Sequence, residues 1–332
     1  MPDKPKVAFY WCASCGGCEE AVVDLAEAIL DVVAVVDIVF WPVAIDFKRK
    51  DIEAMADRSI AAAFLNGAIR TSEQEEMARL LRSKSQVLVA TGSCSHLGGI
   101  PGLANLYSRK AILREVYFES PSTTNPERTF PEREHSNNGH PLELPVFHET
   151  VRSLDQVVDV DFYIPGCPPT ARTFRTALQT LLSWQLPPRG SVLAPDYALC
   201  NECPRKNTKP EKLSFSEFKR PSHVLVDEQQ CLLAQGLVCM GPATRAGCEA
   251  LCVQGNMPCT GCYGPTSRVR DQGAKILSCL ASSIESTDAT EIDRILATIP
   301  DPVGSFYRYG LPRSLLRNRR SQERADSPLA AR

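Results

Sequence analysis

Cysteine is the residue type that could do chemistry in this sequence, and it occurs fourteen times in 332 residues. Four cysteines lie in glycine-containing segments of the first half: Cys15, Cys18, Cys94 and Cys167. Eight more lie close together in the second half: Cys200, Cys203, Cys231, Cys239, Cys248, Cys252, Cys259 and Cys262. Cysteines in such numbers form disulfides, bind structural metal ions or hold iron–sulfur clusters, so their spacing has to distinguish these uses.

The four cysteines of the first half each follow an expected strand. The first pair follows residues 7–11, and the two single cysteines follow residues 86–90 and 157–164. Because ligands of open α/β sheets bind outside the carboxyl ends of the strands, we expect the four thiols at one edge of the sheet. Four thiolates are what a [4Fe–4S] cubane requires, and Gly16 and Gly17 allow the backbone to approach it. Four buried thiols packed as small hydrophobic side chains are the alternative, but they give the glycine-flanked turns no purpose.

The eight cysteines of the second half make two sets of four. Structural zinc is the alternative to clusters here, because zinc sites also contain Cys-x-x-Cys pairs. Zinc sites usually combine one such pair with another roughly 12–20 residues further on. Here single cysteines stand between the pairs at 200/203 and 259/262, which favours clusters. The spacing alone leaves open which four cysteines belong together.

The elements that must position these cysteines alternate between strand and helix in the first half. Strands are expected at residues 7–11, 38–43, 60–65, 86–90 and 157–164. Helices are expected at residues 19–37, after a capping box at residues 72–75, and at residues 170–184. This alternation predicts an α/β fold, a parallel sheet with helices on both faces. Residues 120–145 contain five prolines and are expected to form a surface insertion.

The character of the sequence changes after Pro187-Pro188. Residues 197–264 are rich in Cys, Gly and Pro and have little periodicity, which predicts an irregular domain that needs metal clusters for stability. Helices are expected again at residues 269–282 and 289–297. The last 22 residues hold six arginines against two acids and are expected to form a solvated tail.

Charge and hydropathy limit the partners and the compartment. The net charge of −2 gives no reason to expect nucleic acid or an anionic membrane as partner. No run of eighteen apolar residues occurs, so no membrane insertion is expected. Because the start of the sequence resembles no signal peptide, we expect the reducing cytoplasm, where clustered cysteines bind metal more often than one another.

Several cysteine motifs resemble those of a known family. Trp11-Cys-Ala-Ser-Cys-Gly-Gly-Cys-Glu19, Thr91-Gly-Ser-Cys94 and Pro165-Gly-Cys-Pro-Pro169 resemble the proximal-cluster motifs of the nickel–iron hydrogenase small subunit. Cys239-Met-Gly-Pro-Ala-Thr-Arg-Ala-Gly-Cys248 and Pro258-Cys-Thr-Gly-Cys-Tyr-Gly-Pro265 resemble its medial and distal cluster region. The sequence is most similar to the cytoplasmic group called F420-non-reducing or methyl-viologen-reducing hydrogenases, from residue 5 to about residue 310.

The resemblance implies an architecture and a set of ligands. It implies a flavodoxin-like domain at residues 1–190, an irregular cysteine-rich iron–sulfur domain at residues 191–285, and a C-terminal helix and basic tail at residues 286–332. Matching positions assign Cys15, Cys18, Cys94 and Cys167 to a proximal [4Fe–4S] cluster. They assign Cys248, Cys252, Cys259 and Cys262 to a medial one, and Cys200, Cys203, Cys231 and Cys239 to a distal one.

The same resemblance implies partners and a role in electron transfer. A large subunit would hold the Ni–Fe centre and perform the H₂ chemistry, so no catalytic residue is expected in this chain. This chain would relay electrons through three [4Fe–4S] clusters to a further iron–sulfur or flavin acceptor subunit. A quinone-reductase subunit of the complex I type is an alternative. It shares the N-terminal fold, but the adjacent cysteine pair of that subunit is absent here.

Some positions depart from better-known relatives. Many periplasmic members have histidine where Cys200 stands. Many also have proline and a three-iron cluster where Cys252 stands, so Cys252 implies a four-iron medial cluster. Oxygen-tolerant membrane-bound members have an extra cysteine where Gly16 and Gly17 stand, so an ordinary proximal cubane is implied.

Four further residues are left without a settled role. Cys12 and Cys279 are expected to be small hydrophobic side chains rather than ligands. Glu19 is expected either to contact the large subunit or to cap the first helix. His96 is expected either to donate a hydrogen bond to the cluster edge or to be a plain loop residue.

Overall fold

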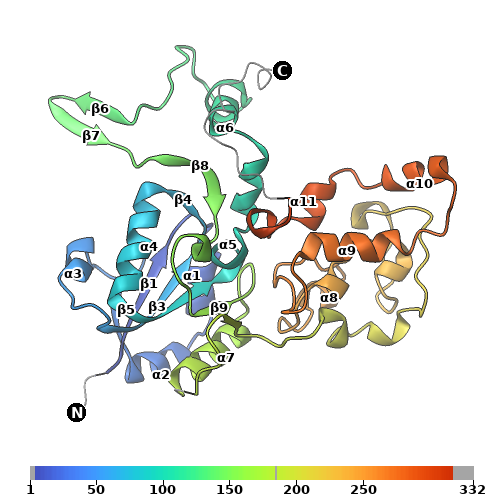
Figure 1. Cartoon of the computed structure of the whole chain (residues 1–332), viewed down its shortest axis with the longest axis horizontal. Coiled ribbons are helices and arrows are strands. Elements are labelled where there is room, and N and C mark those ends of the chain that lie inside the picture. Colours follow the sequence, from blue (N-terminus) through green and yellow to red (C-terminus); the bar gives the residue numbers. More distant parts are fainter. Residues whose placement is uncertain (1–3, 184, 317–332) are drawn as a thin grey trace.

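A six-stranded parallel sheet forms the centre of the first half in the computed structural model, which describes residues 4–183 and 185–316 (Figure 1). The strands lie in the order β10-β9-β5-β3-β1-β2. Their bounds are β1 Lys6–Trp11, β2 Asp37–Phe40, β3 Ile60–Asn66, β5 Ser85–Thr91, β9 Phe162–Ile164 and β10 Ser191–Val192. Apart from the edge strand β10, this is the 2-1-3-4-5 order of flavodoxin-like folds. The predicted fold class is therefore confirmed.

Each face of the sheet has its own hydrophobic core because successive side chains of a strand point to opposite faces. Phe9 and Phe64 lie in one core, whereas Ala8 and Ala63 lie in the other. The first core is covered by α1 (Gly17–Val23), α2 (Ala28–Val35) and α7 (Ala171–Leu182). The second is covered by α3 (Arg49–Glu53) and α4 (Ser72–Lys84). Helices therefore lie on both faces, as predicted.

The single helix predicted over residues 19–37 is wrong, because the structure has two helices there. α1 ends at Val23 and α2 begins at Ala28, with Ala26 between them at a left-handed φ of 50°. The break keeps Leu25 in the core beside Val22, whereas α2 adds only part-buried side chains to that core. Packing thus overrides the continuous helical periodicity of the sequence.

The capping box of α4 lies one residue earlier than predicted. Thr71 is the N-cap, and its hydroxyl accepts a hydrogen bond from the Gln74 N–H at 3.4 Å. The Gln74 side chain accepts one from the Thr71 N–H at 3.0 Å. Ser72 and Glu75, which were expected to fill these roles, are instead in the first turn of the helix.

Glu75 connects α4 to an antiparallel pair formed by the preceding strand β4 (Ile69–Thr71) and by β8 (Phe147–Arg152). Its carboxylate accepts hydrogen bonds from Arg152 and from Arg79, the latter at 2.7 Å. The hydrogen bond from Arg152, followed by that from Arg79, lowers the pKa of Glu75 from 4.5 to about 2. The folded state therefore favours the ionised carboxylate, which stabilises the protein above about pH 4.5.

We expect Glu75→Gln to destabilise the protein at neutral pH by about 2 kcal/mol, the loss of hydrogen bonds to a charged group. The difference from the parent should be constant down to pH 5 and shrink as the pH falls from 4.5 toward 2. The measurement is the urea midpoint by circular dichroism across this pH range. Glu76→Gln is the matched control, because its pair with Arg49 is exposed and should contribute less than about 1 kcal/mol. Equal effects of the two substitutions would contradict the account.

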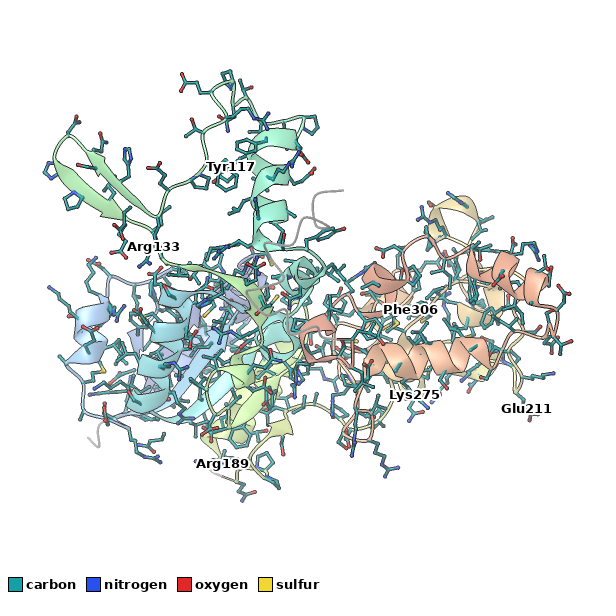
Figure 2. All side chains as sticks on the ribbon, turned by 45° about the horizontal axis from the view of Figure 1, so that its top comes forward. Tyr117, Arg133, Arg189, Glu211, Lys275 and Phe306 are labelled. Carbon is teal, nitrogen blue, oxygen red and sulfur yellow. The ribbon has the colours of Figure 1, made fainter. Side chains whose placement is uncertain are left out.

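Residues 120–145 form a surface insertion, as predicted, and contain an exposed hairpin. β6 (Glu134–Asn137) pairs with β7 (His140–Glu143) through a turn at Asn138 and Gly139, both with positive φ. The chain reaches it through α6 (Arg109–Arg114) and a π-helical turn at Glu115–Glu119. Residues 109–143 thus form an arm that extends away from the sheet, and Figure 2 marks Tyr117 and Arg133 on it.

The second half is mostly irregular and has a separate hydrophobic core that extends from Leu199 to Leu311. Its helices are α8 (Leu251–Gln254), α9 (Gln272–Ala281), α10 (Ala289–Leu296) and α11 (Pro302–Phe306). Short 3₁₀ turns lie at Leu199–Asn201, Lys206–Thr208, Pro221–His223, Leu233–Gln235, Gly241–Ala243 and Leu311–Arg313, and in the first half at Ile100–Leu106 and Leu154–Gln156. Figure 1 shows this half beside the sheet, and Figure 2 marks Lys275, Phe306 and Glu211 within it.

The end of the described chain ties the two halves together. Pro312 packs against Gly98 and Gly102, and its carbonyl accepts a hydrogen bond from Gln156 at 2.9 Å. Most of the predicted basic tail lies outside the described residues. None of the helices in residues 4–183 and 185–316 combines the length and apolar character needed to cross a membrane.

Candidate functional site

The four cysteines of the first half meet where three strands end. Cys15 and Cys18 follow β1, Cys94 lies in α5 (Gly92–Leu97) directly after β5, and Cys167 follows β9. The Ser93 N–H donates to the Gly166 carbonyl at 2.7 Å, which joins the ends of β5 and β9. Burial raises the pKa of Cys18, and the nearby thiols of Cys94, Cys167 and Cys15 raise it further. The structure therefore brings together the four thiols that the sequence predicted at one edge of the sheet.

Glycines hold the backbone against these sulfurs. A Cβ on Gly92 would lie 2.3 Å from the Cys18 Sγ, and one on Gly99 would lie 2.4 Å from the Cys94 Sγ. Both glycines also have positive φ, so no other residue fits without strain. Gly99 was not singled out from the sequence, although its Gly98-Gly99 pair after the cysteine is a visible turn signal.

A second group of four cysteines lies in the irregular half. Cys200, Cys203 and Cys231 line one cavity of about 550 Å³. A Cβ on Gly241 would lie 3.3 Å from the Cys200 Sγ and 3.6 Å from the Cys239 Sγ, so Cys239 joins them. Burial raises the pKa of Cys200 to about 12, with a further contribution from Cys239.

The remaining four cysteines lie between the other two groups. Burial raises the pKa of Cys262 to about 12, and the neighbouring thiols of Cys248, Cys167 and Cys252 add to this. The Ser93 hydroxyl donates to the Cys262 carbonyl, which holds this loop against the strand ends. On the other side, the pKa of Cys259 is raised by burial and then by Cys239. Cys262 thus borders the first group and Cys259 borders the second.

The protonation of these buried thiols limits what they can bind. Burial holds the pKa of Cys94 at about 12, so the free thiol is protonated at neutral pH. Thiolates form there when a metal centre replaces the proton. Among the described residues, no three Cys, His, Asp or Glu side chains are grouped as a single metal ion requires. The four thiolates of a [4Fe–4S] cubane each bind a different iron, so they lie further apart than the ligands of a single metal ion.

Comparison with known proteins gives the family. The sequence model described as NADH ubiquinone oxidoreductase, 20 Kd subunit, matches residues 15–181. The iron–sulfur subunit of the F420-non-reducing hydrogenase of Archaeoglobus profundus is 37% identical over 94% of this chain and 97% of that protein. A subunit of the F420-non-reducing hydrogenase of Methanothermobacter thermautotrophicus is 36% identical over 95% of this chain and 97% of that protein. The chain belongs to the family of small subunits of F420-non-reducing hydrogenases.

This small subunit therefore transfers electrons in a hydrogenase, as its sequence motifs implied. The complex I alternative accounts for the first half alone, because the 20 Kd model matches residues 15–181, whereas the hydrogenase relatives extend across the cysteine-rich half. Membership of this family favours electron transfer over the alternative of a structural zinc-binding interaction protein. The H₂-activated [NiFeSe]-hydrogenase of Dm. baculatum has a similar fold, with a TM-score of 0.51 and 19% identity over 79% of this chain and 95% of that one.

Glu19 has a role that neither sequence expectation described. It is 5% exposed, and its carboxylate accepts hydrogen bonds from the Trp41 indole and from the Asn66 amide, the latter at 2.6 Å. Burial raises the pKa of Glu19. The pairing joins α1 to the ends of β2 and β3 and could not be read from the sequence, because the three residues are far apart along the chain.

The other residues weighed from the sequence also have defined surroundings. Cys12 lies in the core between the sheet and α4, and Cys279 packs against the core of the irregular half. Both are thus part of hydrophobic packing. The buried ring of His96 packs on Tyr163 with the ring centroids 4.6 Å apart.

Proposed function

We propose that this small subunit relays electrons through three [4Fe–4S] clusters between a Ni–Fe centre in a large subunit and an acceptor. The observation that carries the proposal is the order of the three cysteine groups along the molecule. Cys262 of the middle group lies near Cys167, and Cys259 lies near Cys239. Clusters held by these three groups would be neighbours, so an electron could pass from one to the next. Metal sites far apart from one another would not permit this.

The proposed ligands follow these groups. Cys15, Cys18, Cys94 and Cys167 would hold the proximal cluster. Cys248, Cys252, Cys259 and Cys262 would hold the medial one, and Cys200, Cys203, Cys231 and Cys239 the distal one. Each bound cluster supplies one-electron redox chemistry. The residues fit such groups, because glycine backbones at positions 92, 99 and 241 leave the sulfurs room that a Cβ would fill.

The large subunit is proposed to dock on the face that carries the proximal cysteines. Cys15 is exposed there, and nearby large apolar side chains are exposed as well, including Trp11 at 39% and Ile100 at 49%. Ile100 directly follows Gly99, where an added Cβ would lie 2.4 Å from the Cys94 Sγ, so this residue lies beside the proposed cluster. Exposed apolar residues of this kind mark interaction surfaces, and an obligate interface buries more than about 2,000 Å².

We expect Ile100→Asp to disrupt assembly with the large subunit. A carboxylate buried without a partner in the interface costs roughly 3–5 kcal/mol. The measurement is co-purification of the large subunit with the tagged small subunit. Leu225→Asp is the matched control, since Leu225 is fully exposed in the irregular half. Full assembly of the Ile100→Asp variant would count against this docking face.

The acceptor is proposed to bind at the cavity lined by the distal cysteines. The residues that line this cavity include Lys206 and Lys209, which are exposed. Their positive charges would attract a partner with an acidic surface. A further iron–sulfur or flavin subunit is the expected occupant. The same proposal divides the chain at residues 1–190, 191–285 and 286–332. It also assigns the chain to the reducing cytoplasm, where cysteines stay reduced and can bind clusters rather than form disulfides.

The experiment that tests this function is reduction by H₂ of the complex purified with its large subunit. The visible absorption of the clusters should bleach under H₂ in the complex, and the small subunit alone should not respond. Failure of the complex to bleach, with an active large subunit present, would overturn the proposal.

A further inference from the structure

Arg205 is a buried cation whose hydrogen-bond acceptors are all uncharged. It lies two residues after Cys203 and is only 5% exposed. Its guanidinium donates to the carbonyls of Asp227 at 3.1 Å, Gln230 at 3.3 Å and Val253 at 3.3 Å. It also donates to the Asn256 side-chain oxygen at 2.7 Å. No carboxylate in the described part of the chain pairs with it, although a buried charge ordinarily requires an opposite charge nearby.

The position of Arg205 suggests where the opposite charge comes from. Arg205 lines the same cavity as Cys200, Cys203 and Cys231. Two of its carbonyl partners, Asp227 and Gln230, belong to the loop that leads into Cys231.

The other two partners of Arg205 belong to the medial group. Val253 directly follows Cys252, and Asn256 lies three residues before Cys259. The guanidinium therefore joins the loops of the distal and medial cysteine groups.

A cubane held by four thiolates is an anion, and it gains a further negative charge when it is reduced. A fixed cation nearby favours the reduced form and so raises the reduction potential. In a buried setting this interaction is screened much less than at the surface. The neighbouring Lys206 and Lys209 are exposed, so solvent weakens their effect.

We propose that Arg205 is the fixed cation that raises the reduction potential of the distal cluster, and to a smaller degree that of the medial cluster. The anionic clusters in turn compensate the buried guanidinium. This inference rests on the proposed function, because it requires clusters at both cysteine groups. Arg205 is a positioning residue for electron transfer and takes no part in the H₂ chemistry.

The test is an electron paramagnetic resonance redox titration of the intact, cluster-loaded protein. In Arg205→Gln we expect the ratio of reduced to oxidised distal cluster at a given potential to fall about tenfold, which is about 59 mV for a one-electron couple. Arg205→Lys keeps the charge and should restore most of the parent ratio. Arg79→Gln removes an equal charge from the exposed face of α4, and it should leave the ratio of reduced to oxidised distal cluster unchanged.

Asn256→Asp is a second variant that leaves Arg205 in place. Asp has the same shape as Asn and tolerates the positive φ of residue 256. The substitution places a carboxylate oxygen where the Asn256 side-chain oxygen accepts from the Arg205 guanidinium. We expect it to lower the ratio in the same direction as Arg205→Gln. An unchanged potential in both Arg205→Gln and Asn256→Asp, with the full iron complement, overturns the inference.

Iron analysis separates this inference from the proposed function. A parent protein without iron contradicts the proposed function itself. Loss of the distal irons from Arg205→Gln but not from Arg205→Lys supports the charge role. Equal shifts or equal losses of iron in both variants show that the hydrogen bonds matter rather than the charge, which overturns the inference.

Discussion

Gly92→Ala should eliminate the proximal cluster and, with it, electron transfer from H₂. The added methyl group would lie 2.3 Å from the Cys18 Sγ, in a backbone whose φ of +79° already disfavours alanine. Because α5 carries Cys94 directly after this glycine, the clash separates two of the four proposed ligands. Iron content should fall by about a third, the share of one cubane in three, and H₂-dependent dye reduction by the complex should fall to background.

Gly139→Ala is the matched control for this substitution. Gly139 has nearly the same φ, +80°, but no atom lies within 4 Å of the added Cβ. The backbone strain is thus equal, and only the collision with sulfur differs. Full iron content and activity in Gly92→Ala would show that the strand ends do not hold a cluster.

Cys252→Pro should convert the medial cluster to a three-iron form. Cys252 is exposed in the first turn of α8, and among the hydrogen bonds of the described residues none is donated by its N–H. Proline is accommodated best in the first turn of a helix, so the fold should persist. Loss of the fourth thiolate removes a negative charge, which raises the reduction potential of this cluster.

The measurement is electron paramagnetic resonance of the oxidised protein. A [3Fe–4S] signal should be present in Cys252→Pro and absent from the parent, and Cys252→Ala should behave in the same way. Cys279→Ala is the control, because that partly buried cysteine packs against the hydrophobic core of the irregular half. A strong [3Fe–4S] signal in the parent, or no change on substitution, would show that Cys252 is not a ligand.

The strand ends and their cysteines could be predicted because each motif is local. A buried strand, a glycine turn and a cysteine are contiguous in sequence, and the parallel sheet then brings three such turns to one edge. The helix break at Ala26 could not be predicted, because it depends on how Leu25 packs in the core. The pair of β4 and β8 was missed because the two strands are short and separated by the long insertion.

The arrangement of the irregular half lay beyond sequence reasoning for a different reason. Its sequence has no periodicity, so the position of Cys262 near Cys167 depends on how the two halves of the chain pack together. The partners of Arg205 and Glu19 are likewise distant in sequence. By contrast, the hairpin turn at Asn138-Gly139 carried a recognisable signal, because this dipeptide favours the positive φ that the turn requires.

The central claim is that twelve of the fourteen cysteines hold three cubanes, and metal analysis of the anaerobically purified chain tests it most directly. The account predicts a brown protein with about twelve irons and no stoichiometric zinc. A colourless protein with stoichiometric zinc after the same preparation would contradict it.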